Sequence, residues 1–149
     1  PHSRPTPVTL TTINRQLQDK HELFPSDYEG PTGMIGVLSH ELETAGIATL
    51  SMWASVPHYV STPPNPKATY ALIESLEDIL DESINVGELA DMVVRWEQSV
   101  NELIAEDPDV QEYVDNLVEE SDRARPTMVS GDVIAAELQR FLRRHHREG

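Results

Sequence analysis

The sequence contains no cysteine, few aromatic residues and few cations. The absence of cysteine excludes disulfides, thiol catalysis and any cysteine-ligated zinc or iron–sulfur site. The 149 residues include 26 acidic and only 11 basic side chains, and a formal charge of −15 repels nucleic acids. No apolar run approaches the ~20 residues that cross a bilayer, and no signal peptide is recognisable. We therefore expect a cytoplasmic protein with neither a nucleic-acid nor a membrane partner.

The 149 residues of the chain fit one domain of ordinary size, and residues 1–82 show alternating strand and helix patterns. A β-branched run at 8–13 predicts a strand, and the polar stretch 14–31 is typical of a connection. Apolar residues at helical spacing then predict a helix that begins near Thr32. This helix ends where Gly46 suits a left-handed cap.

A second strand is predicted over 47–56, where apolar and polar residues alternate. Asn65 then precedes Pro66, which is the pattern of an N-cap followed by proline at the first helical position. The order strand, helix, strand, helix predicts a βαβ unit with a parallel sheet. Because two strands cannot form a stable parallel sheet, we expect further strands upstream or in another chain. Residues 1–82 are therefore interpreted as the C-terminal part of an α/β core.

The rest of the sequence is helical and unevenly charged. Asn85 with Glu88 fits a capping box, and Asp107 before Pro108 restarts a helix, so residues 83–122 predict a helical hairpin or a sharp kink. This hairpin is acidic.

Residues 74–122 carry 17 acidic side chains against Arg95 alone, whereas six arginines oppose three acidic residues in 123–149. The segment 123–149 predicts a linker and a basic C-terminal helix that lies against the acidic hairpin. The alternative is two solvated helix faces of opposite charge.

The first candidate ligand residues stand at a predicted helix start. Thr32 and Gly33 belong to a glycine-rich stretch at 30–36, where free N–H groups and the helix dipole favour an anion. The spacing matches neither the P-loop nor the dinucleotide fingerprint. The alternative is a turn in which the glycines allow tight packing of the helix on the sheet.

The second candidate group follows the predicted second strand. His58 and Tyr59 stand at its carboxyl end, where α/β sheets bind ligands, and both side chains can hydrogen-bond or stack on a small polar molecule. Lys67 opposes the dipole of the next helix, and a ligand carboxylate or phosphate would compensate for it. The alternatives are polar groups satisfied at a buried strand end and a lysine exposed to solvent.

No catalytic or metal-binding motif is present with the required spacing of its residues. His40 and Glu41 begin like a zinc-protease helix, but Thr44 stands where the second histidine belongs, and there is no G-x-S-x-G elbow or EF-hand loop. His145 and His146 are more typical of a frayed tail than of a metal site. We assign no catalytic residue, no metal and no cofactor, and the sequence leaves open whether the protein is an enzyme.

Three motifs resemble the actinobacterial branch of the proteasome assembly chaperone family. They are Gly-Pro-Thr-Gly at 30–33, Ser-Met-Trp-Ala-Ser-Val-Pro-His-Tyr-Val at 51–60 and Pro-Pro-Asn-Pro-Lys-Ala at 63–68. The opening 1–5 and the ending 130–144 are similar too, so the resemblance spans nearly the whole chain. Members are usually much longer, which agrees with the strands expected elsewhere.

The resemblance implies a three-layer α/β/α core of the phosphorylase/hydrolase-like fold, with this chain as its C-terminal part. It also implies that the following α-helical segment is a lid over a pocket, and that the protein is a homotrimer. Eukaryotic members are heterodimeric chaperones of proteasome α-rings, and archaeal members dock through a C-terminal hydrophobic-Tyr-any motif. This chain ends His-His-Arg-Glu-Gly at 145–149, so the resemblance does not include the docking motif.

These observations support three functional hypotheses. The leading one is a small-ligand-binding protein, with the residues of its site given by Thr32, Gly33, His58, Tyr59 and Lys67. The second is an assembly chaperone or protein-interaction scaffold without catalysis, which holds a protein partner through the acidic hairpin. The third is a ligase or hydrolase, for which the sequence shows no phosphate loop and no catalytic pair.

Overall fold

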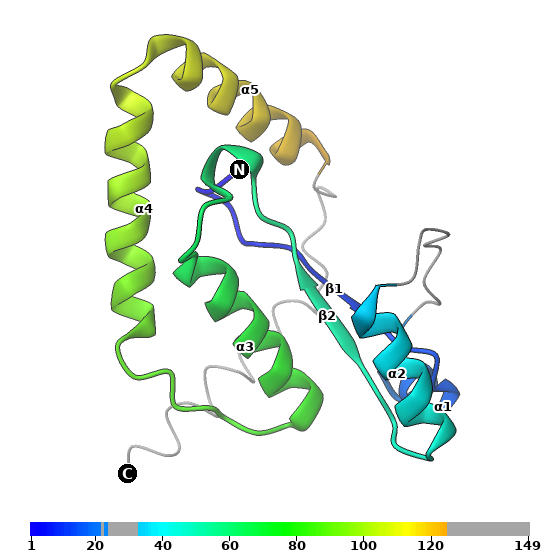
Figure 1. The fold of residues 1–149 in the computed structure, drawn as a ribbon. Coiled ribbons are helices and arrows are strands. Elements are labelled where there is room, and N and C mark those ends of the chain that lie inside the picture. The colour runs from blue at the N-terminus through cyan, green and yellow to red at the C-terminus, as the bar shows by residue number, and fades with distance from the viewer. Residues whose placement is uncertain (22, 24–32, 125–149) are drawn as a thin grey trace.

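A computed structural model describes residues 1–21, 23 and 33–124. In chain order its elements are β1 (Val8–Thr11), α1 (Arg15–His21), α2 (Met34–Thr44), β2 (Ser51–Ala54), the 3-10 helix η1 (His58–Val60), α3 (Pro66–Leu80), α4 (Leu89–Ala105) and α5 (Pro108–Ala124). Figure 1 shows the two strands between α2 on one side and α3 on the other, with α4 beyond α3. The fold is mixed α and β, as predicted. Among the described helices, none is long and apolar enough to cross a membrane.

The two strands are antiparallel, with Val8 opposite Ala54 and Thr11 opposite Ser51. The predicted parallel βαβ unit is therefore wrong. A parallel crossover needs a helix that returns the chain to the start of the first strand. Here α1 and α2 stay near the end of the sheet where β1 stops, so β2 starts at that end and runs back along β1 (Figure 1).

The helix α1 occupies part of the stretch predicted as a connection, and that prediction is wrong for its seven residues. Asn14 caps this helix: its side-chain oxygen accepts from the Leu17 N–H at 3.1 Å, and its carbonyl oxygen accepts from the Gln18 N–H at 3.0 Å. The helix contains no buried residue. Leu17 is the one apolar residue of its sequence, so the apolar stripe by which a helix is predicted is missing.

Two helix caps follow the local rules of the sequence. Asn65 Oδ1 accepts from the Ala68 N–H at 2.9 Å, which confirms the predicted N-cap of α3. Gly46 has a φ of 80° and its N–H donates to the Glu43 carbonyl at 2.9 Å, which confirms the left-handed cap after α2.

The predicted capping box before α4 is wrong. Asn85 Oδ1 accepts from the Gly87 N–H at 2.9 Å, so this side chain closes a local turn and caps no helix. Gly87 has a φ of 53°, a left-handed conformation that interrupts any helix starting at this point. The helix α4 therefore begins later, at Leu89, with Glu88 as its N-cap residue.

The break between α4 and α5 has the predicted cap. Asp107 Oδ1 accepts from the N–H groups of Asp109 and Val110 at 3.0 and 3.3 Å, which confirms the restart of the helix before Pro108. Figure 1 shows α5 leaving the end of α4 at a wide angle, which is the kinked arrangement of the two that the sequence allowed. The predicted basic helix of residues 123–149 lies almost entirely outside the described residues.

The buried core of the described residues lies in the angle between α4 and α5. Its members are apolar side chains of both helices and of η1: Val100, Ile104 and Val114, with Tyr59, Val60, Trp96, Val110 and Val118 packed against them. Full burial of such a side chain stabilises a fold by about 1.5–3 kcal/mol. The loop that follows β2 is therefore held between the two long helices, and its residues His58 and Tyr59 are positioned by them.

Candidate functional site

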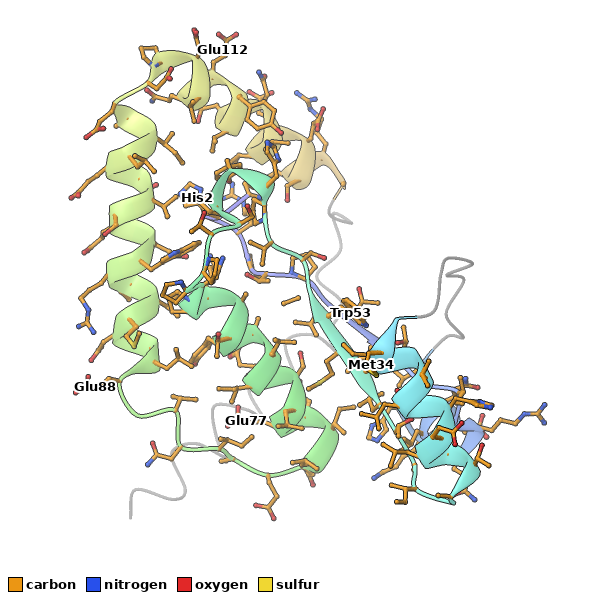
Figure 2. The ribbon with its side chains drawn as sticks, in the orientation of Figure 1. His2, Met34, Trp53, Glu77, Glu88 and Glu112 are labelled. Carbon is orange, nitrogen blue, oxygen red and sulfur yellow. The ribbon has the colours of Figure 1, made fainter. Side chains whose placement is uncertain are left out.

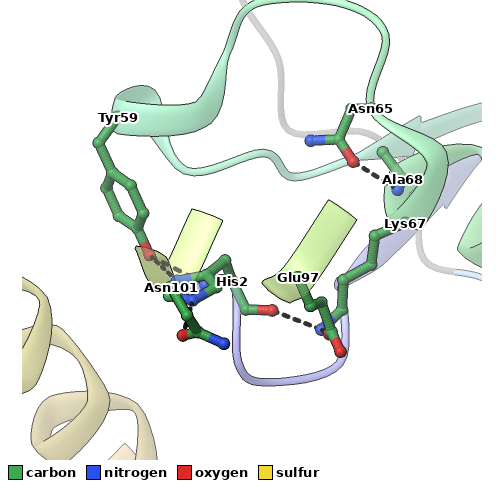
Figure 3. A network of polar contacts seen from close by, with 7 residues as sticks. All are labelled: His2, Tyr59, Asn65, Lys67, Ala68, Glu97 and Asn101. Carbon is green, nitrogen blue, oxygen red and sulfur yellow. Dashed lines mark hydrogen bonds and ion pairs between the residues drawn. The ribbon is translucent and has the colours of Figure 1, made fainter. Parts of the chain in front are cut away.

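His2 is the centre of a polar network that joins the first residues to η1, α3 and α4 (Figure 3). Its side chain is 4% exposed. The ring Nε2 lies 2.9 Å from Asn101 Oδ1, and Nδ1 lies 3.1 Å from the Tyr59 hydroxyl. An amide oxygen only accepts, so the contact with Asn101 assigns a hydrogen to Nε2, and in the tautomer without a hydrogen on Nδ1 the Tyr59 hydroxyl donates to Nδ1.

Tyr59 is bonded twice to the same residue, because its hydroxyl oxygen also accepts from the His2 backbone N–H at 2.9 Å. Burial raises the pKa of the Tyr59 phenol above its ordinary value, while the donated His2 N–H acts in the opposite direction. The phenol is therefore neutral over the whole physiological range and is available as a hydrogen-bond donor to the imidazole.

Lys67 completes the network from the first turn of α3. Its Nζ donates to the His2 carbonyl oxygen and forms an ion pair with the Glu97 carboxylate of α4. The two side chains are 15% and 34% exposed, so the alternative of a solvent-exposed Lys67 is wrong. A cation is unfavourable at the start of a helix, and here the Glu97 carboxylate of the same chain compensates for Lys67. Contact of Lys67 with a ligand stays a prediction.

His58 and Tyr59 are consecutive and share Tyr113 of α5 as a ring neighbour, with the Tyr59 and Tyr113 centroids 6.5 Å apart. The His58 ring is in edge contact with Tyr113 of α5, with ring centroids 5.5 Å apart, and its centroid lies 5.8 Å from that of Tyr59. Tyr59 is also in edge contact with His2 at 5.9 Å. Both rings therefore contact α5, and Tyr59 in addition reaches the N-terminal residues through His2.

Gly33 lies apart from these residues. It precedes α2, and Figure 2 shows the neighbouring Met34 on the other side of the strands from His2. A Cβ added at Gly33 would meet no atom within 4 Å, so tight packing does not explain this glycine. Thr32 lies outside the described residues. The structure thus gathers three of the predicted ligand residues around η1 and leaves Gly33 separate.

A groove of about 420 Å³ lies between α2 and β2. Its lining side chains are mostly apolar and, among the described residues, uncharged: Ile35, Leu38, Ser39, Leu42, Thr49, Leu50, Ser51, Met52 and Trp53. None of them belongs to the predicted ligand site or to the helices α4 and α5. The sequence shows the apolar stripe of α2. A stripe alone does not tell whether the helix packs on the sheet of its own chain or binds another molecule.

The side chains of this groove are accessible to solvent. Ile35, Leu38 and Trp53 are 58%, 56% and 58% exposed, and the adjacent Met34 is 82% exposed. Large apolar residues are normally scattered singly over a protein surface, and a contiguous group of them marks an interaction site. The sequence predicts the helix and the strand that carry these residues, but it does not show that they lie together on the surface.

Among residues 1–21, 23 and 33–124, no group of three or more histidine and carboxylate side chains is arranged to hold a metal ion. His145 and His146 lie outside the described residues. The assignment of no catalytic residue, no metal and no cofactor stays a prediction.

Residues 1–104 match the family described as the PAC2 family. A PAC2 family protein from Streptomyces avermitilis is 46% identical with a TM-score of 0.68, and the match covers 76% of this chain and 48% of that protein. A proteasome-assembly chaperone homologue from Mycobacterium tuberculosis is 44% identical with a TM-score of 0.63, at the same coverages of 76% and 48%. No curated protein matches the chain.

A third solved structure supports the same likeness. A protein of unknown function from Corynebacterium glutamicum is 27% identical with a TM-score of 0.69, over 83% of this chain and 46% of that protein. The chain thus spans about half the length of the solved proteins that it resembles.

Proposed function

The chain belongs to the PAC2 family, and from this membership we propose that it is an assembly protein that binds another polypeptide without catalysing a reaction. The observation that carries the proposal is the exposed apolar groove between α2 and β2. The Mycobacterium tuberculosis relative is itself described as a proteasome-assembly chaperone homologue. Assembly proteins act by binding polypeptides, and an exposed apolar surface is the property that such binding needs.

The composition of the groove supports a polypeptide partner. Aromatic residues and methionine are enriched at the centres of protein interfaces, and charged residues are depleted there. Trp53 and Met52 line the groove together with leucine and isoleucine side chains of α2. The charge of −15 belongs to the rest of the molecule, so an apolar partner meets no carboxylate among the described lining residues.

A direct test uses a photo-crosslinking amino acid in place of Leu38, which lines the groove, and in place of Leu103 as a matched control. Both leucines lie on helices and are exposed, at 56% and 62%. After irradiation in actinobacterial cells, sequencing of the crosslinked peptides should find one recurrent partner protein at position 38 and none at 103. Equal products at both positions, or none at 38, would overturn the proposed function.

A small-ligand site around η1 is the second candidate function. It is supported by the approach of Tyr59 and Lys67 to the same residue, His2. It ranks below polypeptide binding because the polar groups of Tyr59 and Lys67 are already bonded within the chain. The five residues predicted from the sequence, Thr32, Gly33, His58, Tyr59 and Lys67, stay a prediction.

A thermal-shift screen separates the two functions. Nucleosides, nucleotides, phosphate, amino acids and small carboxylates are the probes, since a ligand at ~100 times its dissociation constant adds about 2.7 kcal/mol to the free energy of unfolding. A shift that disappears in His58→Ala would favour the small-ligand site. A shift of equal size in both proteins would place the ligand elsewhere.

Three features implied by the family resemblance belong to this proposal as well. They are the three-layer α/β/α arrangement of the complete core, a lid role for residues 83–122, and assembly as a homotrimer. The match covers about half of the solved relatives, which supports the three-layer arrangement. A sheet of the two described strands is only marginally stable by itself and needs further strands or helices packed on it. Light scattering on a size-exclusion column tests the homotrimer.

A further inference from the structure

The side-chain rings of His58, Tyr59 and Tyr113 meet at steep angles between η1 and α5. The angle between the ring planes is 84° for His58 and Tyr59, 67° for His58 and Tyr113, and 86° for Tyr59 and Tyr113. Rings at such angles do not stack face to face, so each keeps part of a face that a further group can cover. The three rings together form a corner, the ring corner of residues 58, 59 and 113.

The ring corner is fixed on one side and accessible on the other. Tyr59 is half-buried, packs against the core of α4 and α5, and is bonded through its hydroxyl to His2 at 2.9 and 3.1 Å. Tyr113 is 42% exposed, and His58 is exposed as well. Three rings that only filled a core would all be buried. This arrangement instead presents two ring surfaces to solvent beside a third ring that is already held in place.

The spacing of the three rings suits a cation. Their centroids form a triangle with sides of 5.5, 5.8 and 6.5 Å. A cation over this triangle therefore lies within about 6 Å of all three centroids, which is the range of cation–π attraction. A rounded alkylated ammonium can contact several rings that meet at steep angles. The flat guanidinium of arginine, in contrast, stacks on one ring plane at a time.

The charge of α5 favours a cation at the same place. Residues 106–122 include eight carboxylates and neither lysine nor arginine. The exposed Asp109 is four positions before Tyr113, which places the two residues next to each other on one face of the helix. A positive group at the ring corner is therefore attracted by the surrounding field. The described residues contain no group of three histidine and carboxylate side chains arranged for a metal ion, which favours an organic cation.

We propose that the ring corner binds a trimethylammonium group, carried by a small molecule or by a trimethylated lysine side chain. The ring faces of His58, Tyr59 and Tyr113 contact its methyl groups, and Asp109 balances its charge. The inference is independent of the groove between α2 and β2. It rests on the second candidate function, the small-ligand site around η1, and names the ligand class of that site. It also gives a binding role to Tyr113.

Titration of the full chain with choline tests the proposal. The matched control is the neutral isostere of choline, in which a carbon atom replaces the nitrogen and the shape is kept. Calorimetry should give an affinity at least tenfold higher for choline than for the isostere, and choline should shift the backbone amide NMR signals of His58 and Tyr113. Equal affinities would show that the contact is merely apolar, and signals that shift only elsewhere would place the cation at another site. Either result overturns the proposal.

Substitution of Tyr113 separates the ring from the rest of the side chain. Tyr113→Leu should weaken choline binding at least tenfold, because it keeps an apolar side chain but removes the ring. Tyr113→Phe keeps the ring and should bind within threefold of the unchanged protein. Circular dichroism checks that both variants fold. Equal affinity of Tyr113→Leu and the unchanged protein would overturn the proposal.

Substitution of carboxylates tests the contribution of α5. Asp109→Asn should weaken choline binding severalfold, whereas Asp91→Asn, an equivalent loss of charge at an exposed position of α4, should leave it unchanged. Equal effects of the two substitutions would overturn the role of Asp109.

A second probe distinguishes the two sources of the cation. It is a peptide that contains one trimethyllysine, with the unmethylated peptide as its control. Tighter binding of the methylated peptide than of choline would assign the ligand to a polypeptide, and the reverse would assign it to a small molecule. If neither probe binds, the proposal is overturned. The thermal-shift screen and the crosslinking at Leu38 still decide the two candidate functions, because neither uses an ammonium ligand.

Discussion

The imidazole of His2 lies 2.9 Å from the side-chain oxygen of Asn101, although the two residues are 99 positions apart in the sequence. The first residues of the chain are thus attached directly to α4. Arg4 continues the attachment with two bonds to the Asp122 carboxylate at the end of α5, at 2.7 and 2.5 Å. Residues 1–4 therefore contact both long helices. Substitutions among them should weaken the packing of α4 and α5, which are distant in the sequence.

Replacing His2 with alanine should destabilise the protein by about 1–3 kcal/mol, because it removes a buried side chain and leaves the half-buried Tyr59 hydroxyl without the ring nitrogen. Urea unfolding followed by circular dichroism measures the change. Ser3→Ala, at an exposed neighbouring position, should stay within about 0.5 kcal/mol of the unchanged protein. Equal losses of unfolding free energy in the two variants would show that the His2 network does not stabilise the protein.

Lys67 and Glu97 should be energetically coupled. Lys67→Met and Glu97→Gln each remove one partner of the half-buried pair, and the double variant should lose about 0.5–3 kcal/mol less than the sum of the two single losses. Urea unfolding of all four proteins gives the coupling free energy. Strict additivity would show that the ion pair contributes nothing to stability.

Glu43 should make the protein sensitive to acid. Its carboxylate accepts from the backbone N–H of Thr49 at 2.5 Å, and from the Asn14 amide and the Thr49 hydroxyl at 3.1 and 3.2 Å. The Thr49 N–H has the largest effect, and together these donors lower the pKa of Glu43 below its ordinary value of 4.5.

Because the pKa is lower in the folded state, the stabilisation by Glu43 is present above pH 4.5 and is lost as the pH falls through the folded value. In Glu43→Gln this loss should be absent, so its melting temperature should fall less steeply below pH 4.5. Melting curves across the acid range measure the slope. Parallel slopes for the two proteins would be evidence against the bonded carboxylate.

The Arg4–Asp122 ion pair should depend on salt. Its side chains are 29% and 47% exposed, and such pairs are screened when the Debye length falls to about 3 Å at ~1 M salt. Asp122→Asn should lower the melting temperature in dilute buffer more than Glu120→Gln does, although both remove one negative charge from α5. In ~1 M sodium chloride the difference should vanish, and a difference that persists would indicate a structural defect.

Local rules of the sequence account for much of the fold. Asn65 and Asp107 cap their helices as predicted because an N-cap is decided within a few residues. Strand direction was wrong because it depends on where α1 and α2 come to lie, which no local pattern determines. The helix α1 was missed because it buries no residue, and the capping box was misplaced because Gly87 takes a left-handed conformation.

The candidate site was accessible to sequence reasoning only in part. Tyr59 and Lys67 were selected, but their shared neighbour His2 is 57 and 65 positions away, in the opening 1–5 that supported only the family resemblance. The groove was missed for a different reason. The helix and the strand were each predicted, but the exposure of the α2 stripe and of Trp53 depends on how the elements pack, which no local pattern determines.

The antiparallel ladder has a consequence for the order of folding. Its paired residues, such as Thr11 and Ser51, are separated by about 40 positions, so the entropy of closing this loop opposes the first bonds of the ladder. Helices such as α4 and α5 form from neighbouring residues within about a microsecond. We therefore expect the ladder of β1 and β2 to form after the long helices, so a destabilised ladder should slow folding more than a destabilised α4.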